Sequence, residues 1–179
     1  MRQMLSPDVA KVLKRLHYPL EVILRCVRWY CAYPLSLRRL EEMMAERGIS
    51  VDHSTVHRWT IKLLPVLEQA FRRSKRKVGR VPEKVTLDKS GSNVAALDAM
   101  NAGRGKRIVV RQVKYLNNIV EQDHRAIKRR TRPMLGLKNF RCACILLSGI
   151  ELMHMIRKGQ MKNGGKGQTP AQQFYSLAA

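Results

Sequence analysis

Two acidic residues in the second half of the sequence stand where carboxylates could do chemistry. Asp88 ends the short run Lys84–Asp88, which predicts a β-strand, and a turn through Lys89 and Gly91 follows it. Glu121 comes 33 positions later, near the start of a segment, 118–130, that predicts a helix. Because acids at the C-terminal ends of strands often serve catalysis in open α/β sheets, Asp88 is a candidate catalytic residue.

The segment around Glu121 places basic residues beside the carboxylate. His124, Arg125 and Lys128 follow at i+3, i+4 and i+7, so they share one helix face with it. Such a face suits a divalent metal held against nucleic-acid phosphate. The carboxylate would bind the metal, and the basic side chains would contact the nucleic-acid backbone. Structural alternatives stay open: Glu121 could pair with Arg125 near a helix N-terminus, and Asp88 could be a turn-former.

The charge balance predicts a polyanionic partner. The 179 residues include 35 Lys and Arg but 13 Asp and Glu, for a formal charge of +22. Nucleic acid is the simplest such partner, because basic side chains release counterions when they contact phosphates. An apolar content of 45% excludes a disordered basic tail, so part of the chain must pack.

Membrane and secreted classes are not expected. Apolar runs such as Val22–Leu24 and Cys144–Leu147 fall far short of the roughly 20 residues that span a bilayer. The segment Met1–Lys14 has no apolar stretch of the signal-peptide kind. We therefore expect a cytoplasmic protein with free thiols at its four cysteines.

The first half predicts a helix-turn-helix. Apolar spacing predicts helices over Pro19–Ala32, Leu37–Arg47 and about 54–72, with Pro65 kinking or dividing the third. Ser36 is the expected cap of the second helix, and Asp52 or Ser54 that of the third. The order of these helices and the short turn between the last two fit the DNA-binding motif, although two ordinary packed helices with a solvated face remain an alternative.

The front of the third helix supplies the candidate DNA-reading side chains. They are His53, Ser54, Thr55, His57 and Arg58. Arg58 can reach guanine edges, and the hydroxyls of Ser54 and Thr55 can hold phosphates.

A basic run follows this helix. Phe71–Arg80 contains six Lys or Arg and no acid, which predicts either a solvated linker or an arm along the DNA backbone. The candidate contacts are Arg72, Arg73, Lys75, Arg76 and Lys77.

The second half changes character. Beyond the first strand we expect a helix over Ser92–Ala102, a strand over Arg107–Val113 and a last helix over Asn139–Lys158, before a loose Gly-rich tail. The fold class is therefore mostly α with a small α/β part. The cysteines do not have zinc-site spacing, and Cys26 and Cys31 are expected to pack inside.

Four segments resemble bacterial transposases of insertion-sequence family six. They read RWYCAYPLSLRRLEEMMAERGISVDHSTVHRW, VTLDKSG, RQVKYLNNIVEQDHRAIKRRTRPMLGLKNF and GIELMHMIRKGQ, and the likeness covers most of Tyr18–Gln160. The resemblance implies an N-terminal helix-turn-helix, an RNase-H-like core of the Asp-Asp-Glu kind, and DNA cutting and joining with two Mg²⁺ ions at terminal inverted repeats. It places the second catalytic Asp on Asp88 and the Glu on Glu121, both as metal ligands. Further DNA contacts are expected at Lys114, Asn117, Asn118, Arg125, Lys128 and Arg129.

One departure from the family is serious. The first catalytic Asp should stand on an opening strand after the basic arm, but between Trp59 and Asp88 the only acids are Glu68 and Glu83. We interpret the chain as an internally deleted transposase whose core lacks its opening strands. Two acids alone should bind Mg²⁺ poorly, so impaired catalysis is expected.

The expected organisation follows from these elements. It comprises a DNA-binding region at 1–70 with the helix-turn-helix at about 36–70, a basic arm at 71–82, a truncated core at 83–158 and a flexible tail at 159–179. Besides DNA, the chain itself or a full-length transposase is an expected partner. The alternative function is that of a non-catalytic, inhibitory DNA-binding fragment or a non-functional remnant.

Overall fold

A computed structural model describes residues 5–14, 16–75, 82–87, 89, 91–113, 125–134, 137, 139–162 and 167–179. The chain divides into two compact units. The first, which we call the helical unit, comprises Met1–Arg76 and Arg129–Ala179. The second, Lys77–Lys128, we call the α/β unit.

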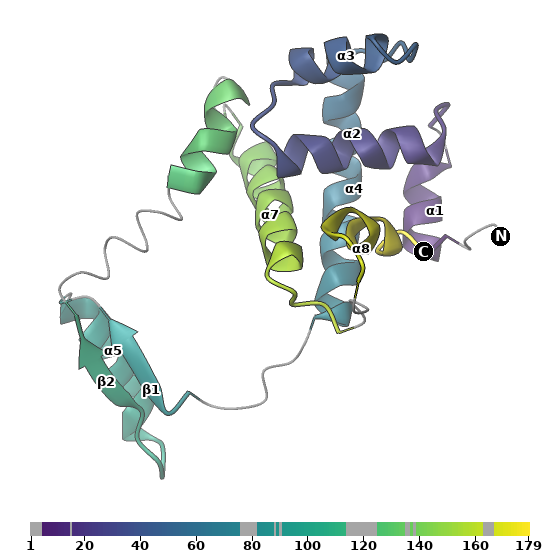
Figure 1. Ribbon diagram of the computed structural model, residues 1–179. Coiled ribbons are helices and arrows are strands. Elements are labelled where there is room, and N and C mark those ends of the chain that lie inside the picture. The colour runs from purple at the N-terminus through teal and green to yellow at the C-terminus, as the bar shows by residue number, and fades with distance from the viewer. Residues whose placement is uncertain are drawn as a thin grey trace. The chain divides into compact units, whose positions relative to one another are not determined.

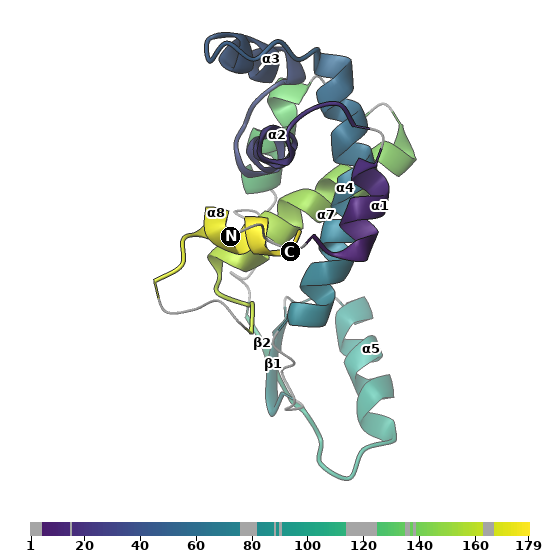
Figure 2. The ribbon, with the colours of Figure 1, turned by 90° about the vertical axis from the view of Figure 1, so that its right-hand side faces the viewer.

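Two long helices form the centre of the helical unit. Helix α4 (His53–Ser74) and helix α7 (Phe140–Arg157) pack against each other, and α2 (Leu20–Ala32) packs against both. Figures 1 and 2 show α2 lying across the direction of α4. The remaining elements are α1 (Pro7–Leu13), α3 (Leu37–Ala45), the 3₁₀ turn η1 (Arg132–Met134) and α8 (Pro170–Ser176).

The predicted N-terminal caps of two helices are confirmed, although the first helix ends at Ala45 and not at Arg47. The Ser36 side chain accepts a hydrogen bond from the Arg39 amide at 3.2 Å and so caps α3. Of the two candidate caps for α4, Asp52 is the residue used. Gly48 takes a φ of +71° in the turn between the two helices, a conformation that favours glycine.

Pro65 does not divide α4, which runs unbroken over 22 residues. A proline removes one amide hydrogen bond inside a helix. Pro65 is exposed, so water can hydrate the carbonyl that loses its donor. The helix therefore tolerates it.

One face of α4 is almost entirely buried. Trp59 is 1% exposed, and its ring meets Tyr18 edge-on with centroids 5.0 Å apart. Each such side chain contributes about 1.5–3 kcal/mol of burial energy. The other fully buried apolar residues on this face are Val56, Leu63, Leu64, Leu67 and Phe71.

Gly149 sets how closely α7 approaches its neighbours. A Cβ atom at this position would lie 2.5 and 2.8 Å from the two methyl carbons of Leu64, and 2.9 Å from Cys31 Sγ. Both neighbours are fully buried, so neither has space to retreat. Burial also raises the pKa of the Cys31 thiol to about 12, which keeps it protonated as a packing group.

The expectation of a loose C-terminal tail over 159–179 is wrong for its last part. Residues 170–176 form α8, whose N-terminus carries a full capping box between Thr169 and Gln172. Phe174 is completely buried, and the Ser6 amide donates to the Ala178 carbonyl at 3.0 Å. The Gly-rich composition of the tail favoured a loose segment, but tertiary contacts hold α8 in place. No helix among the described residues is long and apolar enough to cross a membrane.

The α/β unit contains the predicted strand–helix–strand order. Strands β1 (Lys84–Leu87) and β2 (Val109–Gln112) pair in parallel, with α5 (Gly91–Ala102) as their connection. The Asn101 side chain donates to and accepts from the Ile108 backbone at 3.1 and 2.9 Å, which fixes the end of α5 beside the start of β2. Among the described residues the sheet has two strands.

Gly149→Ala should destabilise the helical unit. Alanine favours a helix by about 1 kcal/mol over glycine, but the new methyl group overlaps Leu64 and Cys31. We expect a net loss of about 1–3 kcal/mol, measured by urea denaturation.

The matched control is Cys144→Ala, an exposed position on the same helix, which should change the unfolding free energy by no more than about 0.5 kcal/mol. Equal stability of Gly149→Ala and the unaltered chain would contradict the close crossing.

Candidate nucleic-acid interface

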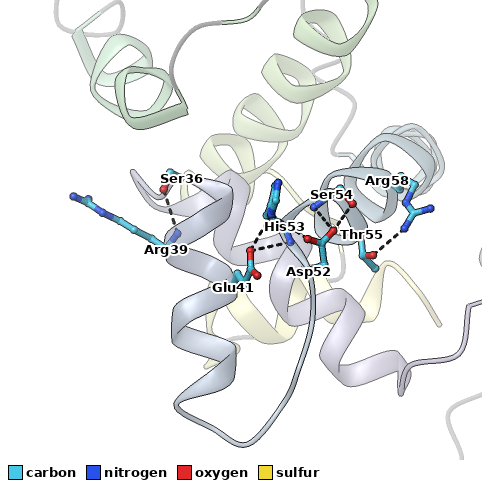
Figure 3. Close-up of polar contacts among 8 residues, drawn as sticks. All are labelled: Ser36, Arg39, Glu41, Asp52, His53, Ser54, Thr55 and Arg58. Carbon is cyan, nitrogen blue, oxygen red and sulfur yellow. Dashed lines mark hydrogen bonds and ion pairs between the residues drawn. The ribbon is translucent and has the colours of Figure 1, made fainter.

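The N-terminus of α4 is closed by Asp52 (Figure 3). The Ser54 amide donates to Asp52 Oδ2 at 2.9 Å, and the Ser54 hydroxyl donates to the same oxygen. The hydrogen bond from the Ser54 hydroxyl is the main cause that lowers the pKa of Asp52 below its usual range. The cap is therefore a carboxylate at neutral pH.

A second carboxylate reaches the same place from α3. Glu41 Oε2 accepts the His53 amide at 3.2 Å and lies 2.9 Å from His53 Nδ1. That ring nitrogen is also 3.1 Å from Asp52 Oδ1. His53 is thus held between two carboxylates, and Glu41 ties α3 to the start of α4 (Figure 3).

These contacts satisfy the first amides of α4. The His53 amide has Glu41 and the Ser54 amide has Asp52, as described above. The amides of Thr55 and Val56 donate to the Asp52 carbonyl at 3.0 and 3.2 Å. Free helix N-termini attract phosphate because their amides lack partners. This one already holds two carboxylates, so an anion that approached it would meet side chains and not free amides.

Arg58 is the exposed cation one turn into α4. Its Nη2 donates to Thr55 Oγ1 at 2.9 Å, so the guanidinium is held against its own helix (Figure 3). Lys62, four positions further, is exposed on the same helix face. The two cations form a short basic stripe.

His57 lies differently from the other predicted reading residues. It is only partly exposed and lines a mostly apolar cavity of about 420 Å³ together with Tyr30 and Leu146. Residues of α2, α4 and α7 line the cavity, together with Leu37 of α3 and Met134 of η1.

The described residues contain one group of side chains of metal-ligand type. Oxygen and nitrogen atoms of Glu41, Asp52 and His53 lie within 4.8 Å of one another. Each of these atoms already takes part in closing α4, and the imidazole nitrogen is a poor ligand for Mg²⁺, which prefers oxygen. The expected metal ligands, Asp88 and Glu121, lie outside the described residues.

The prediction of a basic arm from residue 71 is wrong for its first four residues. Residues 71–74 are the last turn of α4, with Phe71 buried in the core. Arg72 makes an ion pair with Glu68 at 2.6 Å, whose hydrogen bond raises the pKa of this arginine above its usual range. Arg73 lies 3.5 Å from Asp8, and Lys75 Nζ donates to the sulfur of Met155 at 3.5 Å.

The remaining candidate DNA contacts divide into two groups. Arg125, Lys128 and Arg129 are exposed on the helical residues 125–131. The others lie outside the described residues: Arg76, Lys77, Lys114, Asn117 and Asn118.

Sequence reasoning missed Glu41 and Lys62. The i+4 spacing from Arg58 to Lys62 was a signal that could have found the lysine. Glu41 stands 12 positions before His53 on another helix, so only the packing of α3 on α4 brings it to the interface.

Comparison with family models and comparison with curated proteins both show similarity to transposases of insertion sequences. The family model of a DDE domain, of the IS240 transposase type, matches residues 46–160. The transposase for the insertion sequence-like element IS431mec of Staphylococcus aureus is 28% identical over 194 residues, which covers 77% of this chain and 85% of that protein. The transposase for insertion sequence element IS257 in transposon Tn4003, also from Staphylococcus aureus, is 27% identical over the same shares. No solved structure matches.

The Asp52 cap should make stability depend on pH. Because the folded-state pKa of Asp52 is lowered, its charged form adds stability above the unfolded value of about 3.9, and this is lost as pH falls through the folded value. The stability difference between the chain and its Asp52→Asn variant should shrink from pH 6 to pH 3, measured by denaturant midpoints. A difference that is constant over this range would exclude the charged cap.

Proposed function

The chain belongs to the DDE-domain transposases of insertion-sequence family six, and from this premise we propose that it binds the terminal inverted repeats of its element but does not cut them. In this proposal α3 and α4 are the helix-turn-helix, and α4 enters the major groove. The α/β unit is a remnant of the RNase-H-like catalytic core.

The observation that carries the DNA-binding half is the front of α4. Exposed Arg58 and Lys62 follow each other on one face, and Glu41 joins α3 to the start of α4 through His53. A recognition helix needs both, since base reading requires donors at the groove and a rigid frame behind them. The formal charge of +22 supports binding to the backbone as well.

The catalytic half of the proposal rests on a missing carboxylate. Glu68 is the first of the two acids between Trp59 and Asp88, and it lies in α4, paired with Arg72. Glu83 is the second; its side chain accepts from Lys106 at 2.9 Å, and its carbonyl accepts the Val109 amide at 2.9 Å. Neither stands on a strand before β1 within the described parts of residues 5–87.

The alignment with the IS431mec relative supports an internal deletion. Its 194 positions include 77% of 179 residues, about 138, so about 56 positions have no counterpart in this chain. A loss of that size is enough for several strands of about 5–6 residues with their turns.

The expected chemistry explains why such a loss matters. Asp88 and Glu121 would hold Mg²⁺, which in two-metal sites steadies both the attacking and the leaving oxygen. With two carboxylates instead of three the site binds Mg²⁺ weakly, because this ion gives up its water reluctantly. Binding without cutting would let the chain compete with a full-length transposase for DNA ends.

Arg58→Ala should weaken binding to the terminal-repeat duplex by about 1–3 kcal/mol, or roughly 5–150-fold, because a bidentate base contact is lost. Binding to a scrambled duplex should change little. Fluorescence anisotropy at two salt concentrations measures both.

The control for Arg58→Ala is Arg72→Gln, at the far end of α4. In the proposed complex Arg72 contacts the DNA backbone, so this change should weaken binding to both duplexes alike. It should also reduce the salt dependence of the affinity by the equivalent of about one phosphate contact. Loss of affinity for every duplex alike on Arg58→Ala would disprove base reading by that residue.

The purified chain should leave terminal-repeat DNA uncut in Mg²⁺ or Mn²⁺. A denaturing gel after prolonged incubation detects nicks or strand transfer, and Asp88→Ala should give the same pattern as the unaltered chain. Metal-dependent nicking that disappears in Asp88→Ala would overturn the catalytic half of the proposal and leave the binding half untouched.

A further inference from the structure

The five side chains expected to read DNA are not equally available. His53 is held by Glu41 and Asp52, and the Ser54 hydroxyl donates to Asp52. His57 lines the cavity between α2, α4 and α7. The remaining pair is Thr55 and Arg58, joined by a hydrogen bond of 2.9 Å.

The bond to Thr55 leaves a complete recognition edge on Arg58. A guanidinium has two edges that present paired N–H groups, Nε with Nη2 and Nη1 with Nη2. Thr55 Oγ1 accepts one of the two protons on Nη2. Whichever proton it takes, one edge is occupied and the other keeps both of its donors. Among the contacts of the described residues, Thr55 is the partner of this guanidinium.

We propose that Thr55 is a positioning residue, which holds Arg58 so that its remaining edge reads a single guanine. This inference rests on the proposed function, in which α4 enters the major groove. Two parallel donors match the O6 and N7 acceptors of guanine, the base that presents two acceptors at its major-groove edge.

The physical advantage of the Thr55 contact is preorganisation. A free arginine samples many rotamers and loses that freedom on binding, whereas a guanidinium already held at one end loses less. Thr55 is β-branched and restricted at χ1, so its hydroxyl has few positions within a helix. The pair is therefore stiffer than either side chain alone.

The carboxylates behind the pair strengthen the assignment. The first amides of α4 are already satisfied by Asp52 and Glu41, so a phosphate gains little by approaching the helix end. Lys62 is a compact point charge suited to a phosphate, not to a base edge. Arg58 is left as the residue on this face that can discriminate bases.

The test measures how strongly the chain senses one guanine nitrogen. A preferred duplex is first selected from random-sequence DNA with the unaltered chain, and each guanine is then replaced in turn by 7-deazaguanine, which lacks the N7 acceptor. At one position we expect affinity to fall about 10-fold. In Thr55→Val, which keeps the β-branch but lacks the hydroxyl, that ratio should fall to about 3-fold or less, and Thr55→Ser should restore it.

Thr60→Val is the matched control, because it makes the same chemical change on the same helix. The Thr60 hydroxyl donates to the Val56 carbonyl at 2.9 Å, and side chains two positions apart on a helix, such as Thr60 and Arg58, do not face each other. Its 7-deazaguanine ratio should equal that of the unaltered chain, and thermal melts of every variant check that each is folded.

The outcomes separate the inference from the function on which it depends. If Thr55→Val keeps the full ratio, the positioning role is wrong while DNA reading by α4 stands. If no guanine responds to 7-deazaguanine but Arg58→Ala still abolishes selectivity, the choice of guanine is wrong. If the unaltered chain selects no sequence at all, the proposed function fails and this inference with it.

Discussion

The helical unit depends on the close crossing of α7 over α4 and α2 at Gly149. Without a side chain there, Leu64 and Cys31 fill the space that a Cβ would need. The contact holds the middle of α4 from the side opposite its exposed stripe. From the last turn of α7, Arg157 donates to the Ala32 carbonyl at 3.2 Å, which adds a polar tie at the end of α2. The proposed recognition helix is therefore supported by a segment far away in the sequence.

The start of α4 shows how a very basic chain uses its few acids. Asp52 and Glu41 lie at the positive end of the helix dipole, where carboxylates are most favourable. They satisfy backbone amides and hold His53, so they stabilise the frame. The same acids make the helix end unattractive to phosphate. In the proposed complex the surrounding basic side chains therefore contact the DNA backbone, and Arg58 contacts the bases.

The α/β unit has little core of its own. Leu97 and Ile108 are its buried apolar residues among those described, whereas Met100 is 53% exposed and Val109 is 60% exposed. A sheet needs three or more strands, or cover from helices, to be stable alone. Exposed apolar side chains in such a small unit are what the proposed loss of neighbouring strands would leave behind. They also make aggregation of this unit a physical consequence of the same loss.

Local patterns in the sequence determined the helices α2, α3 and α4, the cap at Ser36 and the strand–helix–strand order, because helix spacing, caps and turns depend on residues within one or two turns. The net charge and the family motifs, which are also properties of the sequence alone, indicated DNA as the partner. Only the tertiary structure decided that Glu41 would hold His53, that Gly149 would lie against Leu64, and that the helix capped at Thr169 would bury Phe174. These contacts join residues 12 to 85 or more positions apart, or depend on a buried surface that another helix supplies. The spacing of apolar residues within one helix does not show which distant helix will pack against its buried face.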